Sequence, residues 1–310
     1  MPFASALNFN RLPEKSWKTG AVIRLVISVV ICMLMGAVAT ITFRYFETPQ
    51  SSSMFLFLAL VAAAFGSLAG GLFLLRRPWP LEENYLSRLI GLLSCIYGGL
   101  LFTWIAGRRI TGALELQSPI LGVLLMLLFF QGAAVVLVHF FLREHQISWR
   151  EGFGLNNRPA ASLLIGLCAG ALALYPVLML QALSIQALQR LTFQPHEQQV
   201  VEILRRASGW AAYTVMGAGT IFIAPLGEEL LFRGIFYPAI KRQYGQQIAL
   251  WGTSIVFGVI HFNLDSFLPL TVLAIILVCL YEYTGNLLAP IAVHCFFNAA
   301  NFVALYWQQN

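Results

Sequence analysis

The feature that most constrains the fold of this chain is a series of nine long apolar runs. They cover approximately residues 21–43, 53–75, 89–107, 119–142, 161–185, 210–238, 246–262, 267–283 and 287–306. Because about 20 consecutive apolar residues cross a bilayer as a helix, the runs predict an all-α, polytopic bundle of membrane helices. The runs at 246–262 and 267–283 are short enough to be tilted, shifted or partly re-entrant, so we expect eight or nine membrane helices.

The composition excludes several other classes of protein. Only 10% of the 310 residues are charged and 59% are hydrophobic, whereas about 25% of an ordinary soluble domain is charged. A soluble fold, a disordered chain, a nucleic-acid binder and a small secreted disulfide scaffold are therefore all disfavoured. The lipid bilayer is the expected partner, and the net charge of +6 is typical of basic inner loops beside anionic lipid.

The basic residues also predict an orientation. If the N-terminus is cytoplasmic and all nine runs cross, the inner loops and ends carry 13 of the 19 Lys and Arg residues, and the outer ones carry 6. This bias favours a cytoplasmic N-terminus. The first run, of about 23 residues, is longer than a signal-peptide core and predicts an uncleaved membrane helix. We expect an integral protein of a bacterial plasma membrane.

One polar connection divides the chain. Residues 143–160 form the longest clearly polar segment inside it. The sequence thus predicts an N-terminal membrane extension of four helices over residues 1–142, a cytoplasmic linker over 143–160 and a C-terminal membrane domain over 161–310.

Ionisable residues inside a membrane are costly, and here they gather after residue 225. Glu228, Glu229 and Arg233 lie in one apolar run. Glu229 and Arg233 are spaced i,i+4, so they can pair on one helix face. Glu228 is rotated by about 100° from Glu229 and can point elsewhere without the arginine. A carboxylate in an apolar cavity is suited to act as a general base near neutral pH.

Two further polar clusters follow in the next apolar runs. Phe257 precedes His261 by one helical turn, and His294 precedes Asn298 by the same spacing. A glutamate–arginine pair can simply tie helices together, and a buried histidine can simply bond a carbonyl. Three such clusters within the last 85 residues nevertheless indicate a hydrolytic site, since a base, imidazoles and an amide converge.

The ordered motifs Glu-Glu-x-x-x-Arg, Phe-x-x-x-His and His-x-x-x-Asn resemble those of the CPBP family. This family contains CAAX prenyl endopeptidases and bacteriocin-processing enzymes, and it is also called the Abi family. The resemblance covers roughly residues 145–310 and leaves out the first four runs. It implies that Glu228 activates a water molecule that His261 helps to hold. His294 and Asn298 would stabilise the oxyanion.

In the same resemblance Glu229, Arg233 and Phe257 would support the site. The expected function is an intramembrane endopeptidase that hydrolyses a peptide bond in a membrane-associated protein or peptide. We expect no cofactor. Zinc held by Glu228, His261 and His294 stays open as an alternative, because some relatives have been called metalloproteases, although the chain has no His-Glu-x-x-His motif.

Other chemistries fit the sequence less well. Asp265 is the one aspartate, so an aspartyl pair is unavailable, and there is neither a Gly-x-Ser-Gly motif nor a Cys-x-x-Cys pair. A non-catalytic immunity or binding protein on the same scaffold, and a proton-coupled transporter using Glu228 and the histidines, remain alternatives. The run boundaries place His261 at a different depth from Glu228 and His294. A common site therefore requires tilted helices or shifted boundaries.

Overall fold

The computed structural model describes residues 17–46, 127–191 and 210–309, together with residues 12, 15 and 201. All regular structure in these ranges is helical, which confirms the predicted all-α class. The predicted runs at 53–75 and 89–107, and the first part of the run at 119–142, lie outside the described residues. The count of eight or nine membrane helices therefore stays a prediction, as do the domain boundaries.

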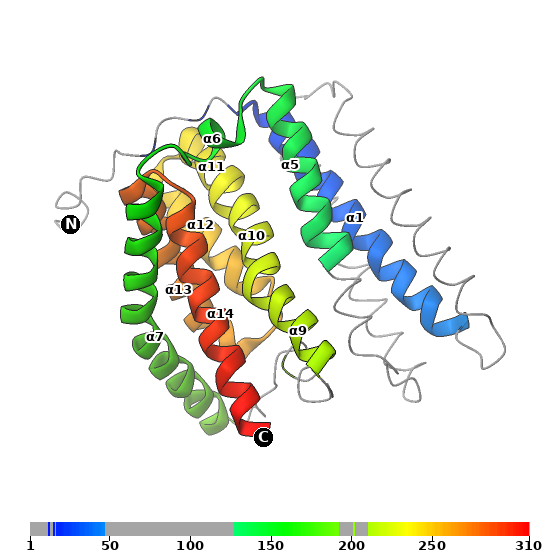
Figure 1. Cartoon of the computed structure of the whole chain (residues 1–310), viewed down its shortest axis with the longest axis vertical. Coiled ribbons are helices and arrows are strands. Elements are labelled where there is room, and N and C mark those ends of the chain that lie inside the picture. The colour runs from blue at the N-terminus through cyan, green and yellow to red at the C-terminus, as the bar shows by residue number, and fades with distance from the viewer. Residues whose placement is uncertain are drawn as a thin grey trace.

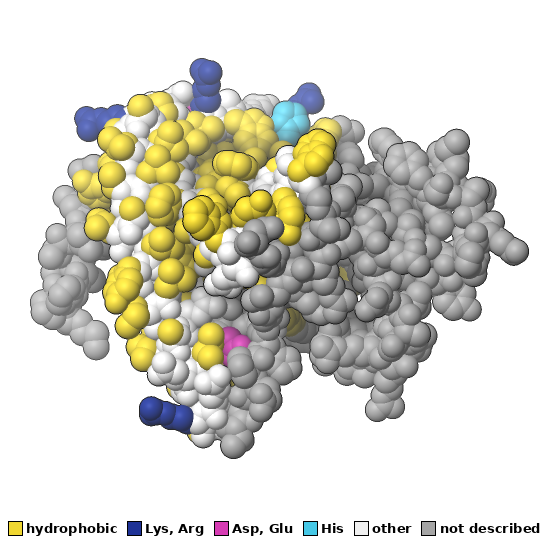
Figure 2. Space-filling model, turned by 60° about the horizontal axis from the view of Figure 1, so that its bottom comes forward, with side chains coloured by type: hydrophobic (Ala, Val, Ile, Leu, Met, Phe, Trp, Pro, Cys, Tyr) yellow, Lys and Arg dark blue, Asp and Glu magenta, His cyan; other side chains and the backbone are white. Residues whose placement is uncertain are grey.

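Four of the described helical stretches are long and apolar enough to cross a membrane. They are Pro159–Arg190, Tyr213–Tyr244, Leu264–Thr284 and Leu288–Gln308. The first of these, α7 (Pro159–Arg190), turns many large apolar side chains outward, including Leu164, Leu172 and Tyr175. Figure 2 shows hydrophobic side chains covering this side of the molecule, with basic side chains towards its margins. This is the distribution expected of a surface that faces lipid.

The stretch at 210–244 is one continuous helix with two widened segments. It runs through α9 (Trp210–Ala218), η2 (Gly219–Ile223), α10 (Ala224–Glu229), η3 (Leu230–Phe236) and α11 (Tyr237–Tyr244), where η2 and η3 are π-helical. Each π segment contains the residue four positions before a proline, Pro225 or Pro238. A proline ring clashes with the backbone carbonyl of the residue four positions earlier and has no N–H to donate to it. The wider π turn relieves this clash. The two glutamates thus lie between two π segments, which often occur at functional sites.

Three C-terminal helices complete this part of the bundle. They are α12 (Gln246–Val259), α13 (Leu264–Thr284) and α14 (Leu288–Gln309). With 14 residues, α12 is shorter than a helix that crosses a bilayer. It packs tightly on α13 at Gly258, where a Cβ atom would lie 2.4 Å from Thr271 Oγ1. Figure 1 shows α7, α14 and α10 side by side.

The N-terminal part packs on the opposite side of α10. α1 (Thr19–Phe46) contacts η1 (Leu127–Gly132) and α5 (Ala133–Glu144), and α5 contacts η3 (Figure 1). The predicted first run, 21–43, therefore lies within a continuous helix. The 1–142 region reaches the glutamate-bearing helix through η1 and α5.

The polar linker packs closely against the turn between α13 and α14 and is hydrogen-bonded to it. Asn157 Nδ2 donates to the Thr284 carbonyl at 2.7 Å, and Asn286 Nδ2 donates back to the Asn157 carbonyl at 2.8 Å. Gly154 has φ +68°, and a Cβ atom there would lie 1.9 Å from the Gly285 carbonyl oxygen. The short helix α6 (Trp149–Gly152) precedes this contact. The linker thus fixes where α14, which bears His294, begins.

Candidate active site

A buried ionic cluster joins two of the three sequence motifs. Arg233 Nη1 donates to Glu229 Oε1 at 2.8 Å, so the pairing predicted from the i,i+4 spacing is present. His294 Nδ1 lies 2.8 Å from the same oxygen. Glu229 is 0% exposed and Arg233 is 1% exposed. Since an ionised carboxylate only accepts hydrogen bonds, Nδ1 of His294 carries a proton, and Glu229 fixes the orientation of the imidazole ring.

The arginine has two further contacts that hold the cluster in place. Arg233 Nη2 donates to the Ala274 carbonyl of α13 at 3.2 Å. Its guanidinium carbon lies 4.6 Å from the centre of the Phe257 ring of α12, within the range of a cation–π contact. One side chain thus connects three helices. The carbonyl and the aromatic face help to offset the cost of burying the charge.

Glu228 has a different environment from its neighbour. Its Oε2 lies 3.8 Å from His294 Nε2, beyond hydrogen-bond distance, and has no hydrogen-bond partner among the described residues. Its side chain is 13% exposed. Among the described residues, Arg233 donates hydrogen bonds to Glu229 and to the Ala274 carbonyl and none to Glu228, although Glu228 lies within its electrostatic field. Glu228 Oε2 could therefore accept a hydrogen bond from a bound water or a substrate group.

The Phe257 ring connects His261 to the rest of the cluster. It contacts His261 at a centroid distance of 4.8 Å and His294 at 5.8 Å. Among the described residues, His261 itself makes no ion pair or hydrogen bond with Glu228 or His294. His261 Nδ1 lies 2.7 Å from the Phe257 carbonyl. A carbonyl only accepts, so Nδ1 carries the proton, and Nε2 of a neutral His261 keeps a lone pair for another donor.

Asn298 lies one turn beyond His294 on α14. Its Nδ2 donates to the Thr220 carbonyl in η2 at 2.8 Å. An amide nitrogen has two N–H groups, so this contact orients the side chain and leaves a second donor. The helix of the two glutamates thus positions both polar residues of the His-x-x-x-Asn motif. It does so through Glu229 for His294 and through Thr220 for Asn298.

The three side chains considered as alternative zinc ligands do not lie around one common point. Within the described ranges, no group of three His, Cys, Asp or Glu side chains is placed to hold a metal ion. Glu228, His261 and His294 therefore do not fit a zinc ion as they stand.

The structure adds contacts that the sequence pattern did not single out. Gln131 of η1 is 1% exposed and packs on Gly227, where a Cβ atom would lie 3.0 Å from Gln131 Cγ. Thr220 and Ala274 contribute backbone carbonyls that accept hydrogen bonds from Asn298 and Arg233, respectively. A pattern of side chains cannot reveal a backbone acceptor. Gln131 is a polar residue inside an apolar run, the same signal that identified the glutamates, and could have been found in that way.

Comparisons with known proteins identify the region that contains these motifs. A family model described as type II CAAX prenyl endopeptidase Rce1-like matches residues 210–300. Residues 210–300 are therefore similar to an Rce1-like domain. This match confirms the CPBP-type resemblance, and together with the four long apolar helices it identifies an integral membrane protein. The matched family is named for an endopeptidase.

A curated relative gives a shorter match. The uncharacterized protein YpbD of Bacillus subtilis is 34% identical over 84 residues. The match covers 26% of this chain and 40% of YpbD, so the chain spans less than half of that relative's length. No solved structure matches the chain.

Proposed function

We propose that this protein is an intramembrane endopeptidase that hydrolyses a peptide bond in a membrane-associated protein or peptide. Glu228 is the general base that activates water. His261 holds that water, and His294 and Asn298 stabilise the oxyanion. The Rce1-like match at residues 210–300 supports this reaction class.

The contrast between the two adjacent glutamates carries the proposal. Glu229 already shares one oxygen with Arg233 and His294. Each glutamate has one buried oxygen without a hydrogen-bond partner among the described residues. The difference is that Glu229 is 0% exposed, whereas the side chain of Glu228, the preceding residue, is 13% exposed and its Oε2 lies 3.8 Å from His294 Nε2. A purely structural pair has no need of this second carboxylate. One glutamate therefore positions the site while its neighbour reacts.

The reaction follows from these positions. Glu228 takes a proton from water, and the resulting hydroxide attacks the carbonyl carbon of the scissile bond. Negative charge develops on the carbonyl oxygen, where the second N–H of Asn298 and the Nε2–H of a protonated His294 donate. The carbon–nitrogen bond then breaks, and Glu228 returns its proton to the leaving amine. No covalent enzyme intermediate forms, and no metal ion is required.

The substrate is sought by comparing proteomes of cells that express wild-type protein or the Glu228→Gln variant. Uncleaved membrane-associated proteins or peptides should accumulate in the Glu228→Gln cells and disappear again when wild-type protein is restored. The matched control is Glu282→Gln, which alters another buried carboxylate outside the site. Cells with this control should resemble wild type at equal protein level.

Two results would contradict the proposal. Identical proteomes for wild type and Glu228→Gln would favour a non-catalytic binding or immunity protein. Proton-coupled flux through reconstituted protein, abolished by Glu228→Gln without any peptide cleavage, would favour a transporter.

A further inference from the structure

Phe153 contacts both helices of the buried ionic cluster from a segment outside them. It follows α6 in the polar linker, so it lies outside residues 210–300, which match the Rce1-like model. Phe153 is 0% exposed. A Cβ atom at Gly234 would lie 2.5 Å from Phe153 Cε1 and 2.9 Å from Cδ1. The ring therefore packs directly on the backbone of the glutamate-bearing helix, at the residue after Arg233.

The backbone of Phe153 contacts the start of α14. Leu287 N donates to the Phe153 carbonyl at 3.0 Å. An N–H at the start of a helix has no partner within that helix, so this hydrogen bond fixes where α14 begins. His294 lies about 10 Å further along, at a rise of 1.5 Å per residue. One residue thus touches both helices that meet at the hydrogen bond between Glu229 and His294.

Phe153 is itself held in place by the linker and α5. Its N–H donates to the Trp149 carbonyl at 3.1 Å, and the centroids of the two rings lie 5.4 Å apart. Trp149 Nε1 donates to His139 Nδ1 of α5 at 3.0 Å. The side chains of Ser148 and Glu151 form a capping box at the start of α6. The ring therefore has a fixed support on the side away from the glutamate-bearing helix.

The hydrogen bond between Glu229 and His294 depends on the spacing of their helices. Its length is 2.8 Å, and hydrogen bonds weaken when their geometry departs from the preferred range. A misplacement of about 1 Å can lower turnover by about 10²-fold. We propose that Phe153 is a positioning residue, which sets the separation between the glutamate-bearing helix and α14 and so holds His294 against Glu229. Its effect on cleavage rests on the proposed function, whereas its effect on the hydrogen bond does not.

The first test is histidine-selective NMR of the full chain in detergent. Phe153→Leu removes the edge of the ring, and Gly234→Ala adds a methyl group that clashes with this edge. Each change should weaken or shift the Nδ1–H proton resonance of His294, which the His294→Gln variant identifies by its absence. The Phe153→Leu/Gly234→Ala variant should restore the resonance, because the added methyl group occupies space that the ring leaves.

The second test is turnover of a peptide that spans the cleavage position of a protein that accumulates in Glu228→Gln cells. Each single variant should lower kcat per folded molecule by about tenfold or more, with KM nearly unchanged, because the displaced imidazole acts on the transition state. The Phe153→Leu/Gly234→Ala variant should recover kcat to within about threefold of wild type, since the two changes are coupled through one contact.

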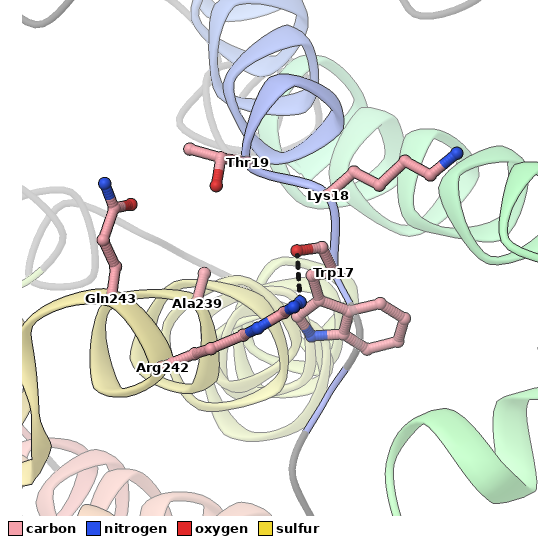
Figure 3. A pocket seen from close by; sticks show the side chains of 6 residues that line it. All are labelled: Trp17, Lys18, Thr19, Ala239, Arg242 and Gln243. Atoms are coloured by element: carbon pink, nitrogen blue, oxygen red, sulfur yellow. Dashed lines mark hydrogen bonds between the residues drawn. The ribbon is translucent and has the colours of Figure 1, made fainter.

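Arg242→Gln is the matched control. Arg242 Nη1 donates to the Trp17 carbonyl at 3.4 Å, which ties the end of the same continuous helix to the N-terminal part (Figure 3). This hydrogen bond does not involve α14, so the control should keep the His294 resonance and a turnover within about twofold of wild type. Equal losses in Arg242→Gln and Phe153→Leu would indicate a general loosening of the bundle and would overturn the proposal.

The remaining outcomes separate this proposal from the proposed function. A wild-type His294 resonance in Phe153→Leu would overturn the proposal whatever the cleavage result, and so would a double variant that recovers neither resonance nor turnover. If variants with Gly234→Ala do not fold, Phe153→Leu decides alone, because it adds no clash. A resonance lost in Phe153→Leu, with no cleavage by any protein including wild type, would support the role of Phe153 and contradict the proposed function alone.

Discussion

Two buried carboxylate clusters in the same bundle have different surroundings. In one, Glu282 Oε1 accepts from Tyr237 at 2.6 Å and from Lys241 at 2.5 Å. The Lys241 side chain is 22% exposed, so this cluster reaches towards water and ties α11 to α13. In the other, Glu229 and Arg233 are almost fully buried. The first cluster links two helices near the end of α11, and the second cluster lies deep in the helix bundle.

A buried carboxylate alone therefore does not mark a reaction site. Glu282 Oε2 has no hydrogen-bond partner among the described residues, and the same is true of Glu228 Oε2 and Glu229 Oε2. What distinguishes the second cluster is the combination of a partly exposed second carboxylate that makes no hydrogen bond with Arg233, an oriented imidazole and an amide within neighbouring turns.

The largest effect on stability is expected when Arg233 is removed. Arg233→Met leaves Glu229 buried without its cation, and breaking a buried ion pair in this way costs about 3–5 kcal/mol. Unfolding in detergent measures the loss. The double variant Glu229→Gln/Arg233→Met should recover much of the stability while cleavage stays low, because His294 is no longer oriented. Wild-type stability in Arg233→Met would show that the pair is not buried as described.

Asn298→Ala should strongly reduce cleavage. Removing one oxyanion donor typically lowers turnover by about 10²–10³-fold. Asn301→Ala is a matched control, since Asn301 lies on the same helix and donates to the Phe297 carbonyl at 3.0 Å. Turnover by the control should stay within twofold of wild type when rates are compared per folded molecule. Equal losses in both variants would indicate a general effect on α14 and no specific oxyanion donor.

Glu282→Gln should produce the opposite result. One acceptor oxygen remains for Tyr237, while the charge attraction to the partly exposed Lys241 is lost. The expected cost is about 1–2 kcal/mol of stability, with cleavage per folded molecule unchanged. The two effects are measured by unfolding in detergent and by turnover of the remaining folded protein. A loss of turnover at normal stability would make Glu282 part of the site and would remove the distinction between the clusters.

Chelation should have the smallest effect. Because the proposed reaction uses Glu228 as the base without a metal ion, dialysis against a chelator should leave cleavage within twofold of the untreated protein. Added zinc should give no increase. Lost activity that zinc restores would instead support the alternative in which Glu228, His261 and His294 hold the ion.

Within the candidate site, the sequence predicted a contact along one helix but not the contacts between helices. Helical spacing was sufficient to pair Glu229 with Arg233, because an i,i+4 contact is local. It could not predict that Glu229 also orients His294, which is 65 residues away on another helix. It also could not predict that the Phe257 ring contacts both His261 and His294, because this contact depends on how α12 packs on its neighbours.

The same limit applies to the fold. Apolar runs predicted the helical class and located α7, α13 and α14 within a few residues. They did not predict the π segments on either side of the two glutamates or the hydrogen bond between Asn286 and the Asn157 carbonyl. These features depend on proline sterics and on backbone carbonyls, which a hydropathy pattern does not record.

The most direct test of the central claim is the cleavage rate of Glu228→Gln protein in lipid vesicles. The substrate is a peptide that spans the cleavage position of a protein found to accumulate in Glu228→Gln cells. Loss of a general base predicts that the rate falls by about 10²–10⁴-fold, while unfolding in detergent stays close to wild type. A Glu228→Gln rate within tenfold of wild type would contradict the assignment of Glu228 as the base.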